Sequence, residues 1–350
     1  MVSLKDIAAA CGVSTATVSK ALNGQKDISE KTKKLICDKA SEMGYLPNTA
    51  ARALKTGRTH NIGVLFMDEA GSGLTHNYFA LMLDAIKRKV EEEGYDITFI
   101  NSSSKGRKLS YLEHARSWHF DGVIIACIRF DSPEVAELAQ SEIPVVTIDY
   151  VFNNCTAVMS NNTKGIEDLL KYIASLGHRK IAYIHGADSA VTRNRIISFR
   201  RTAEALGLDI PEEYLLEAPY RSIKESHDMT LKLLNMKDPP TCILYPDDFA
   251  SLGGRNAIRE LGLRIPEDIS IAGYDGIRIS LFLEPTLTTV QQDTEEIGKV
   301  AAERLIALIE KPQTTLNETV VIDGKILKGQ SVRRIGQTVS MDAFEAASGK

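Results

Sequence analysis

The sequence has few of the features that mark several large classes of protein. Its 350 residues include only five cysteines and one tryptophan. No two cysteines form a C-x-x-C pair, and no cluster of metal-ligand residues is present, so the pattern predicts no metal site. We expect all five cysteines to be buried, unpaired thiols; they are Cys11, Cys37, Cys127, Cys155 and Cys242.

Long apolar runs and catalytic signatures are also missing. The first residues, MVSLKDIAAACGVS, hold too short an apolar run for a signal peptide, and no window approaches the ~20 apolar residues of a membrane helix. The sequence contains no Walker loop, no H-E-x-x-H motif and no G-x-S-x-G turn. These absences predict a cytoplasmic protein that makes no membrane contact, has no cofactor and is not an enzyme.

Charge is distributed unevenly along the chain, whose net charge is −4. Residues 1–58 hold ten Lys or Arg and five Asp or Glu, which makes this stretch +5, whereas the remainder is −9. A small basic module on an acidic body is typical of a nucleic-acid reader that is joined to a second function.

The first 46 residues predict an all-α domain of three short helices. Ser3 begins a capping-box pattern and Gly12 ends the first helix, while Ser14 caps the second. Ser29 caps the third helix, which Gly44 ends. A helix, a glycine turn and a second helix form a helix-turn-helix, whose second helix presents its early residues to the base edges of DNA.

The outward face of the second predicted helix carries side chains that suit DNA. Lys20 can reach guanine acceptors, and Thr15 or Ala16 can touch a thymine methyl group. The hydroxyls of Thr17 and Ser19 lie beside them. We therefore predict that this helix reads sequence in the major groove.

Residues 47–60 predict a linker that contains a hinge helix. Pro47 begins a short run of good helix formers, and Gly57 ends it. An isolated helix of about ten residues is marginal in water, so we expect this one to form only when it is supported.

From residue 61 to residue 335, apolar strands alternate with amphipathic helices, which predicts an α/β core of parallel sheets covered on both faces. So many strands suit two lobes, roughly 61–160 with 290–320 and 161–289 with 321–335. Residues 336–350 read as a polar tail. The expected strands are Ile62–Phe66, Ile97–Ile100, Gly122–Ala126, Val145–Ile148, Ile181–His185, Ile243–Tyr245 and Ile269–Gly273; the expected helices include Leu81–Glu93, Gly165–Leu176 and Phe249–Leu261.

Several stretches give the sequence a family likeness. LKDIAAACGVSTATVSKALN, from Leu4 to Asn23, and GYLPNTAARAL, from Gly44 to Leu54, are similar to the DNA-binding head and hinge of the lactose-repressor and purine-repressor family. SLGHRKIAYIHG from Ser175, RIPEDISIAGYD from Arg264 and LTTV from Leu287 extend the resemblance over residues 3–335. It implies a core like a periplasmic sugar-binding protein, with two lobes and a hinge that the chain crosses three times.

The resemblance also implies DNA contacts at individual positions. Base readers fall on Thr15, Ala16 and Lys20. A leucine of the hinge, here Leu54, enters the minor groove as an apolar wedge, with Asn48 and Ala51 beside it. Contacts to phosphate fall on Thr17, Ser19, Asn23, Ser29 and Thr32.

An effector site is implied at the carboxyl ends of the strands, where ligands of such sheets bind. Asp275 matches an acceptor of sugar hydroxyls and Arg195 an effector-binding arginine. Carboxylates with aromatic faces suit a neutral sugar. The other positions of this predicted site are Tyr78, Phe79, Asp149, Tyr220 and Asp247. For His178, which follows a predicted helix, we expect contacts with the last carbonyls of that helix.

The leading hypothesis is a homodimeric repressor of a carbohydrate-utilisation operon that binds a palindromic double-stranded operator under control of a sugar-like effector. Alternatives within the same class are a global regulator with a phosphoprotein corepressor and a nucleobase-responsive repressor. From other classes come a sugar receptor without DNA function and a nicotinamide-dependent enzyme. For the enzyme, Gly71-Ser72-Gly73 is half of a dinucleotide loop, but His76 stands where the third glycine belongs.

Overall fold

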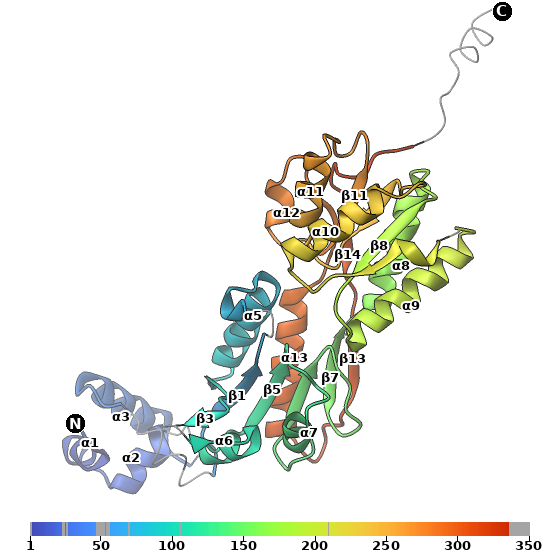
Figure 1. Cartoon of the computed structure of the whole chain (residues 1–350). Coiled ribbons are helices and arrows are strands. Elements are labelled where there is room, and N and C mark those ends of the chain that lie inside the picture. Colours follow the sequence, from blue (N-terminus) through green and yellow to red (C-terminus); the bar gives the residue numbers. More distant parts are fainter. Residues whose placement is uncertain are drawn as a thin grey trace, which may run out of the picture. The chain divides into compact units, whose positions relative to one another are not determined.

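The computed structural model describes residues 2–22, 25, 27–46, 53, 57–68, 71–104, 107–208 and 210–335. The chain divides into a small unit, Met1–Thr59, and a large unit, His60–Lys350 (Figure 1). Most of the predicted hinge helix and all of the predicted tail lie outside the described residues. Within the described part of the chain, no helix is both long and apolar enough to cross a membrane.

The small unit holds three helices: α1 (Leu4–Cys11), α2 (Thr15–Leu22) and α3 (Glu30–Glu42). The predicted capping box at Ser3 is confirmed, and the left-handed φ of 65° at Gly12 ends α1 as expected. Ile7, Val18 and Ile36, one from each helix, are fully buried and form the centre of a small core.

The first sheet of the large unit has the strand order β13-β7-β6-β5-β1-β2, and its described strand pairs are all parallel. The short strands β3 (Ser103–Ser104) and β4 (Arg107–Lys108) form a separate antiparallel pair. The six strands of the sheet are β1 (Asn61–Phe66), β2 (Asp96–Phe99), β5 (Gly122–Ala126), β6 (Val145–Ile148), β7 (Thr156–Ser160) and β13 (Thr319–Ile322).

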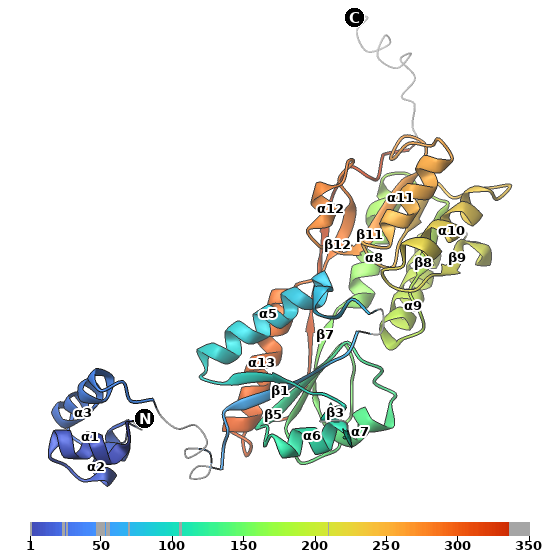
Figure 2. The ribbon, with the colours of Figure 1, turned by 60° about the vertical axis from the view of Figure 1, so that its left-hand side comes forward.

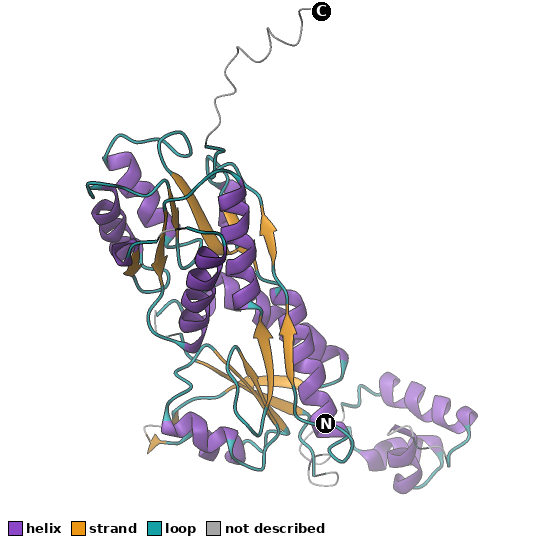
Figure 3. Ribbon diagram, turned by 90° about the vertical axis from the view of Figure 1, so that its right-hand side faces the viewer, coloured by secondary structure: helices purple, strands orange, loops and turns teal. Residues whose placement is uncertain are grey.

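Helices lie on both faces of the first sheet, as the sequence predicts (Figure 3). α5 (Asn77–Glu92) and α13 (Thr294–Glu310) lie side by side although they are far apart in sequence (Figure 2). Gly298 permits this approach, because a Cβ atom there would lie 2.5 Å from the backbone oxygen of Met82. The short turn η1 (Gly73–Thr75) precedes α5, and α6 (Tyr111–Ser117) and α7 (Pro133–Ala139) complete this lobe.

The second sheet has the order β14-β12-β11-β10-β8-β9, and β14 is antiparallel to β12. Its strands are β8 (Ile181–His185), β9 (Leu215–Glu217), β10 (Cys242–Leu244), β11 (Ser270–Asp275), β12 (Thr288–Gln291) and β14 (Lys325–Leu327). Its helices are α8 (Asn162–Ser175), α9 (Ala190–Ala205), η2 (Glu212–Tyr214), α10 (Ile223–Leu234), α11 (Ser251–Glu260) and α12 (Ile279–Phe282).

The chain passes between the two sheets three times, after β7, after β12 and after β13. The sequence places residues 321 and 322 in the second lobe, whereas pairing of β13 with β7 puts them in the first sheet. The strands that were not predicted are β3, β4, β7, β9, β12, β13 and β14, of which β3, β4 and β9 are only two or three residues long. Polar Thr and Ser dilute the apolar signal of β7 and β12, and β13 and β14 are short and half-exposed.

The expectation of five buried thiols is wrong for three of them. Cys155 and Cys242 are buried, but Cys11 and Cys127 are partly exposed and Cys37 is exposed. Cys37 follows the buried Ile36 on α3, and adjacent residues of a helix cannot both face a small core. All five cysteines are free thiols.

Candidate DNA-binding surface and effector site

Three predicted base readers lie exposed on α2. Thr15 and Ala16 stand at the start of the helix, where major-groove helices contact bases, and Lys20 follows one turn later. The ammonium of Lys20 lies 2.5 Å from a carboxylate oxygen of Asp27, and about half of each side chain is exposed. Such an exposed ion pair contributes little to stability, so Lys20 can exchange Asp27 for DNA at small cost.

Three predicted phosphate contacts, Thr17, Ser29 and Thr32, belong to hydroxyl pairs at the start of a helix, and in each pair a serine caps the helix. Ser14 accepts a hydrogen bond from the backbone N–H of Thr17, and the two hydroxyls are 2.9 Å apart. Ser29 likewise accepts from the N–H of Thr32 at 3.2 Å. These hydroxyls lie at helix N-termini, whose dipoles attract phosphate. Ser19 is half-exposed. Four further predicted DNA contacts lie outside the described residues: Asn23, Asn48, Ala51 and Leu54.

Arg195, on α9, is buried in the second lobe. Its Nε atom donates to the side-chain oxygen of Asn162 at 2.7 Å, and Nη1 donates to the carbonyl of Pro246 at 3.1 Å. The guanidinium carbon lies 3.6 Å from the ring centroid of Tyr274. This stacking holds the guanidinium plane in place beside the end of β11.

Asp275 ends β11 with a left-handed φ of 98°. The side-chain nitrogen of Gln292 donates to its carboxylate at 2.7 Å. Burial raises the pKa of Asp275 to about 7, and the charge of Arg195 opposes that rise. A carboxylate with such a pKa is poised between an acceptor and a hydroxyl-like donor near neutral pH.

Tyr78 and Asp149 join this cluster from the first lobe. The hydroxyl of Tyr78 lies 3.4 Å from both Asp149 and Gln292, and the N–H of Ser160 donates to Asp149 at 2.8 Å. Burial raises the pKa of Asp149. Gln292 therefore connects Tyr78 to Asp275 across the two lobes, and sequence reasoning missed it. The position of Gln292 directly after β12 could have identified it from the sequence, because ligand-binding residues of such sheets follow the strands.

Asp247 lies at the end of β10, but its carboxylate has backbone partners. One oxygen accepts from the N–H of Arg221 and the other from the N–H of Ala250, both at 2.7 Å. The adjacent Asp248, which sequence reasoning missed, is also buried and accepts from Thr289 and from the N–H of Ile277. Both residues position the loop before α11.

Two aromatic residues of the predicted effector site, Tyr220 and Phe79, lie in different lobes. The Tyr220 hydroxyl lies 2.8 Å from that of Thr192, and its ring covers Gly186, where a Cβ atom would lie 2.2 Å from the ring. Phe79 packs edge-on against Phe66, with ring centroids 5.5 Å apart. Tyr220 thus lies near Arg195, whereas Phe79 supports Tyr78 from the first-lobe side.

His178 has other partners than expected. It is fully buried, with its ring nitrogens 2.8 Å from the Thr241 hydroxyl and 3.0 Å from the Arg333 carbonyl. Burial lowers its pKa, so the neutral ring gains nothing from a helix dipole. It fastens the last described segment to the second sheet instead.

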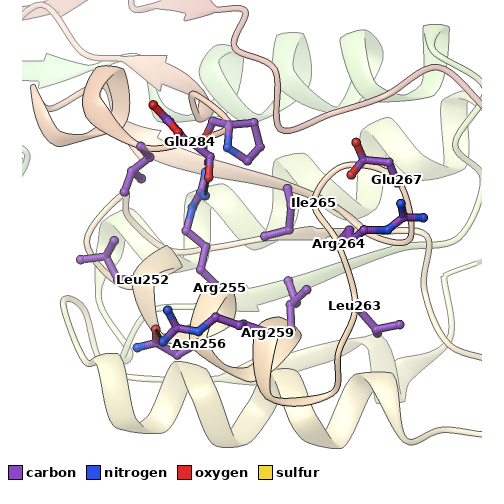
Figure 4. Close-up of a pocket in the computed structure, with 12 residues that line it drawn as sticks. Leu252, Arg255, Asn256, Arg259, Leu263, Arg264, Ile265, Glu267 and Glu284 are labelled. Carbon is purple, nitrogen blue, oxygen red and sulfur yellow. Dashed lines mark hydrogen bonds between the residues drawn. The ribbon is translucent and has the colours of Figure 1, made fainter.

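A pocket of about 500 Å³ lies elsewhere, between α11 and the segment around Pro285 (Figure 4). Arg255 points across it and donates to the carbonyls of Glu284 and Pro285. Arg264 is occupied by Asp268 at 3.1 Å. These partners give the arginines a structural role there, and this pocket contains none of the predicted effector residues.

A helix-turn-helix unit on a two-lobed α/β core with a buried polar cluster between its lobes defines a ligand-responsive DNA-binding regulator. The comparisons with known proteins agree. Residues 3–48 match the family described as bacterial regulatory proteins, lacI family, and residues 170–332 match the periplasmic binding protein-like domain. The chain belongs to the LacI family.

Relatives match over nearly the whole chain. It is 30% identical over 339 residues to the probable HTH-type transcriptional repressor ExuR of Bacillus subtilis, with 96% of this chain and 99% of that protein covered. It is 28% identical over 341 residues to the HTH-type transcriptional repressor PurR of Mannheimia succiniciproducens, with 96% and 100% covered. A solved structure of the lac repressor dimer bound to operator and the anti-inducer ONPF shares the fold, with a TM-score of 0.79 at 24% identity and coverage of 95% and 99%.

Proposed function

We propose that this chain is a homodimeric transcriptional repressor of a carbohydrate-utilisation operon, and that a small sugar-like effector sets its affinity for a palindromic operator. The observation that carries the proposal is the exposed face of α2, with Thr15, Ala16 and Lys20, on a head that matches the LacI family. A palindromic site requires two such heads related by a twofold axis. Such a protein would bind chromosomal DNA in the cytoplasm and would catalyse no reaction.

The polar cluster between the lobes supports the allosteric part of the proposal. Tyr78 and Asp149 come from the first lobe, Arg195 and Asp275 from the second, and Gln292 stands at a crossing between them. A ligand that binds here contacts both lobes, so its affinity depends on their arrangement. It can shift operator affinity only by its differential affinity for the two arrangements, typically about 1–3 kcal/mol.

The test separates operator binding from effector response. A binding-site selection supplies the operator, and fluorescence anisotropy on the labelled site measures affinity with and without effector. Thermal shift with a panel of sugars and nucleobases identifies the effector, since a ligand that binds the folded state raises the melting temperature. We expect Asp275→Ala to lose the effector response and to keep operator binding.

Two results would contradict the proposal, and a third would favour an alternative to it. Full-length protein that selects no consensus site is not a sequence-specific regulator. A normal effector response of Asp275→Ala would place the effector elsewhere. Stabilisation by hypoxanthine or guanine, with no response to any sugar, would favour the nucleobase-responsive alternative.

A further inference from the structure

A second arginine, Arg221, lies where the two lobes meet. It precedes α10 in the second lobe, and its Nε atom donates to the hydroxyl of Ser72 in the first lobe at 3.1 Å. Its guanidinium lies 4.4 Å from the ring centroid of Phe249. Asp247 accepts the backbone N–H of Arg221, which has a left-handed φ of 61°. Both ends of the residue are therefore held in place.

The charge on this arginine has no direct ion-pair partner within the described part of the chain. Two carboxylates lie in the same region: Asp68 accepts from the N–H of Ser72, and the charge of Arg221 opposes the rise in the pKa of Asp247. Among the residues that the structure describes, neither Arg221 nor Arg195 makes a salt bridge, and Nη1 and Nη2 of Arg221 make no hydrogen bond. The carboxylates of Asp247 and Asp248 are occupied by backbone N–H groups and a hydroxyl. A guanidinium that is positioned but unpaired fits a ligand that brings its own negative charge.

The first lobe offers uncharged donors beside Arg221. His76 stands at the N-terminus of α5, a helix of 16 residues, and no side chain caps this helix. His76 is 92% buried, and its Nδ1 atom has no hydrogen-bond partner within the described part of the chain. Burial and the charge of Arg221 lower the pKa of His76 to about 4, so the ring is neutral and can donate from Nδ1. The N-terminal N–H groups and the dipole of α5 also favour an anion.

We propose that the effector is an acidic sugar, and that its carboxylate or phosphate lies between Arg221, Nδ1 of His76 and the uncapped N-terminus of α5. The hydroxyls of the same molecule then face Asp275 and Arg195. This inference rests on the proposed effector function of the cluster. It also replaces the neutral sugar expected from the sequence, because that expectation took no account of Arg221.

The test is isothermal titration calorimetry on the full chain with matched ligands. The probes are glucuronate and galacturonate, their neutral parents glucose and galactose, and the two hexose 6-phosphates. We expect at least one acid or phosphate to bind about tenfold or more tightly than its neutral parent, as a charge-assisted contact predicts. A preference for the phosphates over the uronates identifies the anion as phosphate, and the reverse identifies a carboxylate.

Variants show whether Arg221 is the cause. Arg221→Met should remove the preference for the acid, so that the acid and its neutral parent bind this variant within about twofold of each other, and Arg221→Lys should restore part of the preference. The matched control is Arg193→Met, because Arg193 is exposed and paired with Asp188. Neutral parents that bind as tightly as the acids, no binding of any charged probe, or an unchanged preference in Arg221→Met would each overturn the proposal. Operator binding without ligand, measured on the same preparation, shows separately whether the regulator function holds.

Discussion

At the scale of single residues, Asp275 is a predicted effector contact that also makes the stability of the protein depend on pH. Its folded pKa of about 7 lies above its ordinary value of 3.8, so the folded protein binds a proton that the unfolded chain has lost. The contribution of this residue to the free energy of unfolding is therefore fully present below pH 4 and is lost as the pH rises through 7.

We predict that Asp275→Asn removes this loss, which amounts to about 2–4 kcal/mol at most. Urea unfolding of the full chain at pH 5 and pH 8 measures it. The variant should lose less stability between the two pH values than the wild type, whereas Asp188→Asn, which changes an exposed carboxylate, should match the wild type. Equal pH dependence in Asp275→Asn and wild type would mean that Asp275 titrates normally in the folded state.

Lys20 is the second residue with a specific consequence. We predict that Lys20→Ala costs about 1–3 kcal/mol per half-site and abolishes operator preference, while weak salt-dependent binding to any DNA persists. Base contacts specify a site, and phosphate contacts supply much of the remaining affinity. Binding-site selection with Lys20→Ala, and with Lys34→Ala on α3 as the control, checks this. The same consensus from both variants would show that Lys20 does not read a base.

At the scale of elements, we predict that the hinge segment decides how tightly the head binds DNA. Residues 47–56 are too few to hold a helix without support. Two such segments on DNA can support each other, and Leu54 can then wedge into the minor groove. We predict that Leu54→Ala lowers specific DNA affinity and leaves effector binding unchanged. Anisotropy on the operator and calorimetry with the effector measure the two quantities, and operator binding as tight as in the wild type would disprove the hinge-wedge assignment.

The contact between α5 and α13 is the second element with a clear physical requirement. Gly298 faces backbone atoms of α5, and a methyl group there would lie 2.8 Å from the Cβ of Ala85 as well as 2.5 Å from Met82 O. We predict that Gly298→Ala separates the helices and destabilises the first lobe by about 1–3 kcal/mol, the usual cost of overpacking. Chemical unfolding measures this destabilisation. The matched control is Lys299→Ala, on the exposed face of α13. Gly94→Ala would be a poor control, because the left-handed φ of Gly94 makes any side chain there strained. Stability equal to that of the wild type would mean that the helices can move apart freely.

At the scale of the whole molecule, the exposed apolar surface of α12 predicts where two copies meet. Leu281 is 59% exposed and Phe282 74% exposed, although both are large apolar residues on one short helix. Contiguous exposed apolar patches often mark interaction sites, and we predict that a second copy covers this one. We expect a dimer in light scattering, because a palindromic operator requires two heads related by a twofold axis.

The matching variant is Phe282→Asp, which should shift the protein towards monomers and weaken operator binding, since one head then binds without its partner. Leu316→Asp changes a leucine that is 83% exposed outside α12, and it should leave the dimer intact. A stable tetramer at micromolar concentration, or a fully dimeric Phe282→Asp, would contradict this part of the argument.

The sequence by itself determined the head and the order of the core. Ser3, Gly12 and Ser29 specify helix ends through local backbone chemistry, and short apolar runs such as Gly122–Ala126 and Val145–Ile148 specify buried strands at the predicted bounds. Both signals are local, because a cap or a run of apolar side chains acts on its own segment whatever the rest of the chain does.

Only the tertiary structure decided which polar groups still have hydrogen-bonding positions free for a ligand. Asp247 and Asp275 both follow a strand, yet backbone N–H groups occupy both oxygens of Asp247, while Gln292 binds Asp275 from 17 positions further along the chain. Arg221 and Ser72 are 149 residues apart and meet only because the two lobes fold against each other. Hydrogen-bond partners and burial are long-range properties, and they set the charge and the free donors of a site more strongly than the identity of any one residue.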